Sequence, residues 1–126
     1  MFTNTKAFSG FSVGDIETAK KFYADTLGVR VSENPAGLTL HIAGDRSILV
    51  YPKADHVPAT YTILNFPVDD IDAAVDALTE RGVTFQRYEG MPQDERGVQR
   101  QWGPPIAWFT DPAGNVLSVI EAEEPA

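Results

Sequence analysis

The sequence contains an internal repeat that constrains its fold more than any other feature. Residues 11–29 (FSVGDIETAKKFYADTLGV) and residues 66–83 (FPVDDIDAAVDALTERGV) follow one pattern, offset by 55 positions and, after a one-residue slip, by 54. The matching pairs are Phe11 and Phe66, Val13 and Val68, Asp15 and Asp70, Ile16 and Ile71, Ala19 and Ala74, and the closing Gly-Val dipeptides. A repeat of this size indicates one supersecondary unit built twice. Two such units related by a pseudo-twofold axis would enclose a cleft, and we expect the functional site there.

Apolar spacing and turn residues predict the same order of elements in both halves. In the first half we expect a strand over 7–13, a helix capped by Asp15 and ended by Gly28, and strands over 29–33, 38–42 and 47–51. In the second half we expect a strand over 60–68, a helix over 70–81, and strands over 83–88, 105–110 and 115–121. The sequence therefore predicts an α+β fold of two βαβββ repeats, in which a helix layer covers a mixed eight-stranded sheet.

Length and composition indicate a single globular domain. The 126 residues include no cysteine, which excludes disulfides, thiolate catalysis and Cys-ligated metals. No apolar run approaches the roughly 20 residues that span a bilayer, and the first ten residues lack the basic and apolar regions of a secretory signal. We therefore expect a cytoplasmic protein that does not bind membranes.

The net charge of −8 opposes binding to nucleic acid, because that affinity comes largely from Lys and Arg neutralising phosphates. The charge has two interpretations. It can simply aid solubility, or its field can attract a cationic small molecule.

Three motifs carry a resemblance to a known family. The pattern V-x-D-I-x-x-A-x-x-F-Y-x-x-x-L-G-V over residues 13–29 is followed by V-D-D-I-D-A-A at 68–74 and D-P-x-G-N at 111–115. Together they resemble the vicinal oxygen chelate superfamily, which includes glyoxalase I, bleomycin-resistance proteins and extradiol dioxygenases. The resemblance implies a single domain over 1–126, with unit one at about 5–52, a linker at 53–58 and unit two at about 59–122. It also implies that the sheet is cup-shaped, with the helices outside, ligands inside and a homodimeric assembly.

The resemblance further implies four positions for a divalent metal, one on the first and one on the last strand of each unit. In this chain they are occupied by Phe8, Val50 (or Tyr51, if the alignment shifts by one residue), Ile63 and Ser118. Apolar side chains and a neutral hydroxyl do not hold a divalent cation. We expect no metal and no other cofactor. The two histidines, His41 and His56, are interpreted as a hydrogen-bonded strand residue and a solvated linker residue.

Without a metal, the cup has the character of a small-molecule site. Strand alternation places Ser12 with Phe8, and Asn65 with Ile63, on the inner face. An apolar lining with a few neutral hydrogen-bonding groups is typical of ligand pockets. Asn65 has an alternative role, which is a hydrogen bond to a neighbouring strand. The candidate ligand-binding residues are Phe8, Ser12, Val50, Ile63, Asn65, Trp102, Trp108 and Ser118.

The loop over 89–103 is longer than most connections, and such loops are often lids or binding segments. It carries Arg96, Arg100 and Trp102, which could close over a ligand. The alternative is a solvated flap whose Trp102 packs against the sheet edge.

Two functional classes, with a third of lesser weight, follow from these residues. The first is a metal-free protein that sequesters a small hydrophobic or cationic compound, as bleomycin-resistance proteins do. The second is a metal-independent enzyme, a lyase or an isomerase, that uses His56, Tyr51 or Lys53 as its acid or base. The third is a regulatory or interaction scaffold. Glyoxalase and dioxygenase chemistry are disfavoured by the residues at the metal positions.

Overall fold

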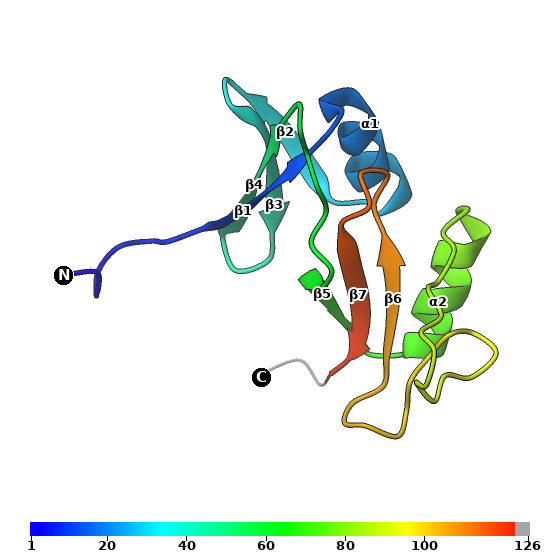
Figure 1. Ribbon diagram of the computed structural model, residues 1–126. Coiled ribbons are helices and arrows are strands. Elements are labelled where there is room, and N and C mark those ends of the chain that lie inside the picture. Colours follow the sequence, from blue (N-terminus) through cyan, green and yellow to red (C-terminus); the bar gives the residue numbers. More distant parts are fainter. Residues whose placement is uncertain (123–126) are drawn as a thin grey trace. The chain divides into compact units, whose positions relative to one another are not determined.

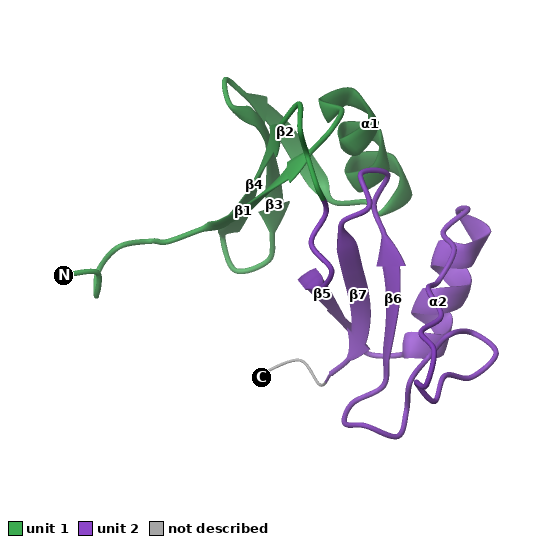
Figure 2. Cartoon of the chain, in the orientation of Figure 1, with its two compact units in different colours: residues 1–57 green, residues 58–126 purple. Residues whose placement is uncertain are grey.

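The computed structural model describes residues 1–122 and divides into two compact units (Figures 1 and 2). Unit 1 is Met1–Val57 and unit 2 is Pro58–Ala126. The boundary lies inside the linker predicted at 53–58. The single-domain organisation and the cup remain predictions.

Unit 1 is a four-stranded sheet with one helix against it (Figure 1). Its elements are β1 (Ser9–Val13), α1 (Ile16–Lys21), a π-helical continuation η1 (Phe22–Thr26), β2 (Arg30–Asn34), β3 (Gly37–Ile42) and β4 (Arg46–Pro52). The strand order is β1-β4-β3-β2, with β1 parallel to β4 and the other pairs antiparallel. The first strand of the unit therefore lies beside the last.

The ends of the first helix are formed as the sequence predicts. Asp15 caps α1, because its carboxylate accepts hydrogen bonds from the backbone N–H of Glu17 (3.1 Å) and the hydroxyl of Thr18 (2.7 Å). The helix ends where Gly28 adopts φ 71°, a left-handed conformation that glycine accepts without strain. The N–H of Val29 then bonds back to the carbonyl of Tyr23 (2.8 Å), and the chain turns into β2.

The hairpin between β2 and β3 depends on a second glycine. Gly37 has φ 149°, and a Cβ added there would lie 2.3 Å from the carbonyl oxygen of Val50. The carboxamide oxygen of Asn34 accepts from the N–H groups of Ala36 (2.7 Å) and Gly37 (2.9 Å) and holds the turn. The close approach lets β3 pack directly against β4.

Unit 2 repeats this plan with a three-stranded sheet. Its elements are β5 (Thr62–Val68), α2 (Ile71–Glu80), β6 (Ile106–Thr110) and β7 (Val116–Glu121). The strand order is β5-β7-β6, with β5 parallel to β7 and β6 antiparallel to it. Asp70 caps α2 through the N–H of Ala73 (3.1 Å) and thus occupies the place that Asp15 has in unit 1.

In each unit the helix covers one face of the sheet and buries the core there. In unit 1 the buried side chains include Val13, Tyr23, Leu38, Leu40 and Val50. In unit 2 they include Ile71, Val75, Phe109, Leu117 and Val119, and Phe85 packs edge-on against Phe109 at 5.6 Å between ring centroids. Within residues 1–122, neither unit has a helix of its own on the opposite face of its sheet, and we call these the helix-free faces of unit 1 and unit 2.

The α+β class and the repeated strand–helix order are confirmed, but residues 1–122 contain seven strands, and residues 83–88 are not a regular one. The N–H of Gln86 does reach the carbonyl of Trp108 (2.8 Å). However, the side chain of Gln93 takes the neighbouring backbone groups, since it donates to the carbonyl of Gln86 (2.9 Å) and accepts from the N–H of Tyr88 (2.8 Å). A side chain thus replaces the partner strand that a continuous ladder needs.

No helix within residues 1–122 is long and apolar enough to cross a bilayer.

Candidate functional site

Strand register decides which residues of unit 1 lie on its helix-free face. Phe11 contacts Tyr23 of the helix layer at 5.9 Å between ring centroids, and Phe11 pairs with Val50 across β1 and β4. Both residues therefore point toward the helix. The next pair, Ser12 and Tyr51, points the opposite way.

Val50 consequently does not line the helix-free face with Ser12, although the sequence analysis placed both in one lining. It is fully buried in the core under α1, and the one-residue alternative, Tyr51, shares the face of Ser12 instead. Phe8 precedes β1 and is 68% exposed. It borders a shallow hollow of ≈ 310 Å³ with Asn34, Thr39, Ser47 and Leu49.

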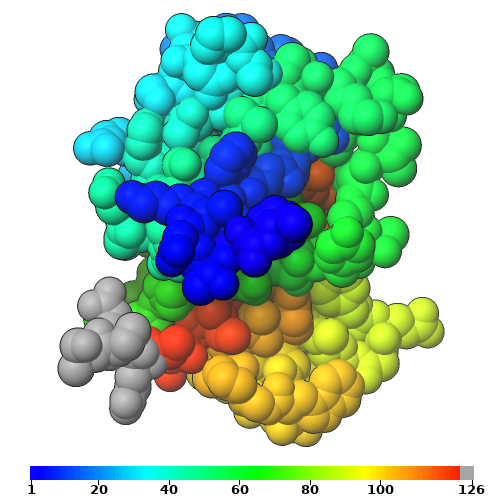
Figure 3. Space-filling model, turned by 90° about the vertical axis from the view of Figure 1, so that its left-hand side faces the viewer, coloured from blue at the N-terminus to red at the C-terminus, as the bar shows by residue number. Residues whose placement is uncertain are grey.

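The N-terminal segment before β1 is exposed. In the space-filling view its atoms, in blue, form part of the visible surface (Figure 3). Met1 and Phe2 are also exposed, so the first eight residues present apolar side chains to solvent.

A serine–histidine pair lies on the helix-free face of unit 1. The Oγ of Ser12 and the Nδ1 of His56 are 2.7 Å apart and hydrogen-bonded, although 44 residues separate them. A turn places the histidine there, because the N–H of His56 bonds the carbonyl of Lys53 (3.0 Å) and the N–H of Lys53 bonds that of Val13 (3.0 Å). His56 is therefore bonded to the sheet and is not a plain solvated linker residue.

The other titratable candidates of unit 1 have different partners. The Nζ of Lys53 pairs with the carboxylate of Asp55 at 2.7 Å, with both groups exposed. The Nε2 of His41 and the Oγ of Ser32 are hydrogen-bonded at 2.7 Å, as expected of a strand histidine with a local partner. Of the acid–base candidates, His56 is therefore the one bonded to Ser12, and Tyr51 is the register partner of that serine.

The helix-free face of unit 2 carries three of the candidate residues in one row across the sheet. Asn65 of β5, Ser118 of β7 and Trp108 of β6 are register partners. The buried hydroxyl of Ser118 donates a hydrogen bond to the Oδ1 of Asn65 at 2.5 Å. Asn65 thus has the alternative role considered for it, a bond to a neighbouring strand, and the residue is exposed.

Trp108 forms the apolar part of this face. Its indole Nε1–H donates to the Oγ1 of Thr62 at 3.1 Å, so the ring reaches over β7 toward β5. The Tyr88 ring packs edge-on against it at 5.5 Å between centroids. Burial raises the pKa of the Tyr88 hydroxyl above its ordinary value. The Trp108 end of the row therefore carries two packed aromatic rings.

Sequence reasoning missed Thr62 and Tyr88 as parts of this face. Strict alternation from Asn65 puts Thr62 on the opposite side, but the ladder shifts register between Thr62 and Leu64. Ile63 lies in this irregularity and has no partner residue in β7. Tyr88 belongs to the segment that was expected to be a strand. No local pattern gave a signal for either residue.

The residues at the four metal positions do not fit a divalent cation. Phe8 and Ile63 have no donor atom, Val50 lies in the core, and the Ser118 hydroxyl is used by Asn65. In the described part of the chain, no group of three or more His, Asp or Glu side chains could hold an ion elsewhere. Imidazole and carboxylate donors, which these metals require, are absent from all four positions.

The loop over 89–103 is bound to α2 by ion pairs. Arg96 forms a two-pronged pair with Asp76 (Nε–Oδ1 2.9 Å, Nη2–Oδ2 3.3 Å). Arg100 bonds Asp72, and its Nε lies 3.0 Å from the Oδ2 of Asp94. The Arg96 guanidinium holds the pKa of Asp76 below its ordinary value, and the carboxylates raise the pKa of both arginines. Arg96 and Arg100 are thus paired with carboxylates of unit 2, and a ligand would have to compete with these ion pairs.

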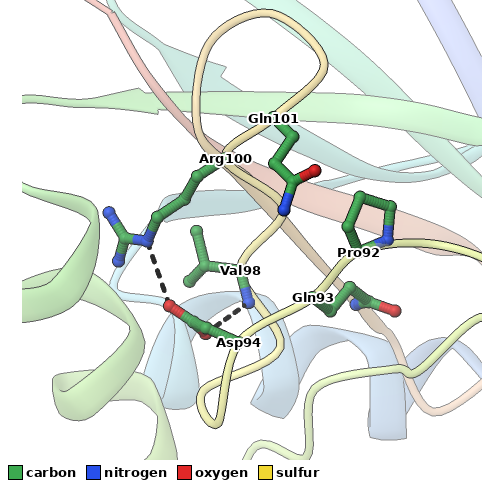
Figure 4. Close-up of a pocket in the computed structure, with 6 residues that line it drawn as sticks. All are labelled: Pro92, Gln93, Asp94, Val98, Arg100 and Gln101. Carbon is green, nitrogen blue, oxygen red and sulfur yellow. Dashed lines mark hydrogen bonds and ion pairs between the residues drawn. The ribbon is translucent and has the colours of Figure 1, made fainter.

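The interior of the loop is also ordered by hydrogen bonds. The Asp94 carboxylate accepts from the N–H of Val98 (3.0 Å) and from Arg100, and these groups border a hollow of ≈ 210 Å³ (Figure 4). Gln99 exchanges backbone hydrogen bonds with Ile106 (2.9 and 3.0 Å) and extends the edge beside β6. Trp102 remains 60% exposed, while its N–H and carbonyl bond the Gln99 side chain.

Comparisons with known proteins agree with this framework. Residues 8–119 match the family model of the Glyoxalase/Bleomycin resistance protein/Dioxygenase superfamily. A superfamily member of known structure from Sphaerobacter thermophilus DSM 20745 is 28% identical, with a TM-score of 0.70 over 97% of this chain and 100% of that one. TnmS3, an antibiotic binding protein from Streptomyces sp. CB03234, is 28% identical, with a TM-score of 0.64 over 96% of this chain and 99% of its own.

A curated relative is similar over most of its length. The uncharacterized protein YraH of Bacillus subtilis (strain 168) is 26% identical over 124 residues, which cover 86% of this chain and 91% of YraH. The resemblance first seen in the repeated V-x-D-I and D-P-x-G-N motifs is thus confirmed. This chain belongs to the Glyoxalase/Bleomycin resistance protein/Dioxygenase superfamily.

Proposed function

We propose that this protein binds a small hydrophobic or cationic compound without a metal and acts by sequestering it. The observation that carries the proposal is the helix-free face of unit 2. There Ser118, at a position where related enzymes hold a metal, bonds Asn65 beside the indole of Trp108. The antibiotic-binding relative of 28% identity supports the same class of function.

The chemistry of this face suits an aromatic ligand. Trp108 and Tyr88 offer ring surface, and aromatic pairs gain about 0.5–1.5 kcal/mol beyond their buried area. Asn65 and Ser118 add neutral hydrogen-bonding groups, and a few such groups on an apolar wall orient a bound molecule. The net charge of −8 favours a cation over an anion of the same shape.

The proposal has three further parts that rest on the sequence and the family. The protein is cytoplasmic, it forms a homodimer, and it binds neither nucleic acid nor membranes. Size-exclusion chromatography with light scattering tests the assembly directly, because a dimer doubles the 13.8 kDa chain mass.

Calorimetric titration with two aromatic dyes of opposite charge tests the binding function. Ethidium, a cation, should bind more tightly than 1-anilinonaphthalene-8-sulfonate, an anion. The difference should shrink as salt is raised, because ions screen the field of the protein. Binding of neither dye, or tighter binding of the anion, would contradict the proposal.

One observation favours a second candidate, a metal-independent enzyme. The hydrogen bond between Ser12 and His56 places an imidazole beside a hydroxyl on the helix-free face of unit 1, next to Tyr51. Histidine titrates near neutrality and is the usual general base. If a bound compound is turned over and His56→Ala abolishes turnover while binding persists, the enzyme class replaces sequestration.

A further inference from the structure

The hydrogen bond between Ser118 and Asn65 fixes the direction of an amide on the helix-free face of unit 2. Ser118 is 0% exposed, and its hydroxyl hydrogen is directed to the Oδ1 of Asn65. A buried hydroxyl without a partner would cost about 1–3 kcal/mol, so this bond is costly to break. The amide carbonyl is therefore held toward β7, and the NH2 group points away from Ser118.

The other polar groups of this row already have partners. The indole N–H of Trp108 is donated to Thr62, and the Ser118 hydroxyl is donated to Asn65. Neither proton is available to a ligand unless an existing bond breaks. The NH2 group of Asn65 is the donor that the row presents, and Asn65 is exposed.

Trp108 supplies an aromatic surface near the NH2 group of Asn65. It is the register partner of Ser118 on the side opposite Asn65, and its ring reaches over β7 to Thr62. An aromatic surface and a fixed NH2 group thus flank one buried serine.

We infer that this face selects planar aromatic compounds that carry a carbonyl oxygen, with the NH2 of Asn65 as donor to that oxygen and Trp108 against the ring. Ser118 is a positioning residue, because it holds the amide in the donating direction. The inference rests on the proposed binding function and adds the chemical class of the ligand. A neutral amide donor then lies beside Ser118, which occupies one of the four positions that the family resemblance gives to a metal ligand.

Two probes of nearly equal shape isolate the carbonyl. 2-Acetylnaphthalene and 2-isopropenylnaphthalene differ by exchange of C=O for C=CH2, and neither is charged. Calorimetric titration should show that the ketone binds roughly five- to tenfold more tightly, which is the contribution of one hydrogen bond. The ratio of the two dissociation constants is the readout, because general damage to the site changes both constants together.

Asn65→Asp tests the amide donor most directly. A carboxylate still accepts from Ser118, but it has no NH2 to donate, so the preference for the ketone should fall to about one or reverse. Gln101→Glu is the matched control, because it makes the same amide-to-acid change at an exposed loop position of unit 2 and should keep the preference. Asn65→Leu removes the donor without adding charge and should also abolish the preference.

Ser118→Ala tests the positioning role. The amide is then free to rotate, so the preference should fall by about two- to threefold while the alkene binds as before. Thermal unfolding of each variant shows whether the fold is retained.

The outcomes separate this inference from the proposed function. Equal binding of both probes by the parent protein, or an unchanged preference in Asn65→Asp and Asn65→Leu, would overturn the inference and leave the binding function in place. Binding of neither probe would overturn the inference by itself. Failure of the dye titration as well would overturn both.

Discussion

The two helix-free faces differ far more than the two helix-covered faces. Under the helices, unit 1 and unit 2 use equivalent parts: Asp15 and Asp70 cap the helices, and Val50 and Leu117 are fully buried in last strands. On the helix-free faces, unit 1 presents a serine–histidine pair, Ser12 with His56, whereas unit 2 presents an amide and a hydroxyl beside a tryptophan. The repeat thus keeps the helix caps and buried strand residues that build each unit, whereas the side chains on the two helix-free faces differ.

The largest expected effect tests the assignment of faces in unit 1. Val50→Asp places an unpaired carboxylate in the core and should destabilise the protein by several kcal/mol, enough to unfold it. Tyr51→Asp, one residue later and 37% exposed, should change the free energy of unfolding by less than about 1 kcal/mol. Urea denaturation measures both, and equal effects would contradict the register of β4.

The affinity for ethidium should depend on the helix-free face of unit 2 and not on that of unit 1. Trp108→Ala removes the ring surface of unit 2 and should weaken ethidium binding by about tenfold or more, since buried aromatic residues dominate such sites. Tyr51→Ala removes a ring from unit 1 and should change the affinity by less than about twofold. Trp108→Phe, which keeps an aromatic ring, should recover part of the loss. A larger effect at Tyr51 would move the binding surface to unit 1.

Acid should loosen the loop of unit 2. Burial opposes the Asp94 charge, but bonds from the Val98 N–H, Arg100 and the Arg96 N–H outweigh it and hold the pKa of Asp94 below its ordinary value. A lowered pKa means that the ionised carboxylate stabilises the loop above about pH 4, and this stabilisation disappears as the pH falls through the folded-state pKa.

The NMR shift of the Val98 amide, which bonds Asp94, should report that loss during an acid titration. Asp94→Asn should remove this pH dependence. If the Val98 amide shift shows the same acid transition in Asp94→Asn, another group is responsible.

The smallest effects concern ion pairs. Arg100→Met breaks partly exposed pairs and should cost about 0.5 kcal/mol in the free energy of unfolding. Lys53→Met in unit 1 breaks an exposed pair with Asp55 and should shift the urea midpoint by no measurable amount. A larger loss for Lys53→Met would mean that the linker turn depends on that charge.

Much of the fold could be predicted because its signals are local. Helix caps, the glycine stop at Gly28 and strand alternation depend on neighbours within a few residues. The missing strand over 83–88 could not be foreseen, because the side chain of Gln93, several residues later, occupies its backbone groups.

The candidate site was partly predictable for the same reason. Asn65 follows from strand alternation, Ser118 from the family resemblance and Trp108 from a predicted strand, and the structure brings them into one row. Val50 was expected in one lining with Ser12, but it pairs with Phe11 on the helix-covered face, because one residue of register reverses every side chain in a strand. The bond between Ser12 and His56 depends on a linker turn whose direction no sequence pattern specifies.

Gly37 has a consequence for how this sequence can change over time. Most positions of a domain tolerate several residues, but a single added carbon here meets the Val50 carbonyl at 2.3 Å, and the backbone also has φ 149°. Amino-acid substitutions in β3 and β4 are therefore confined to those that leave this contact intact. Saturation mutagenesis should recover glycine alone at this position, which makes it a fixed point for aligning distant descendants of the same unit.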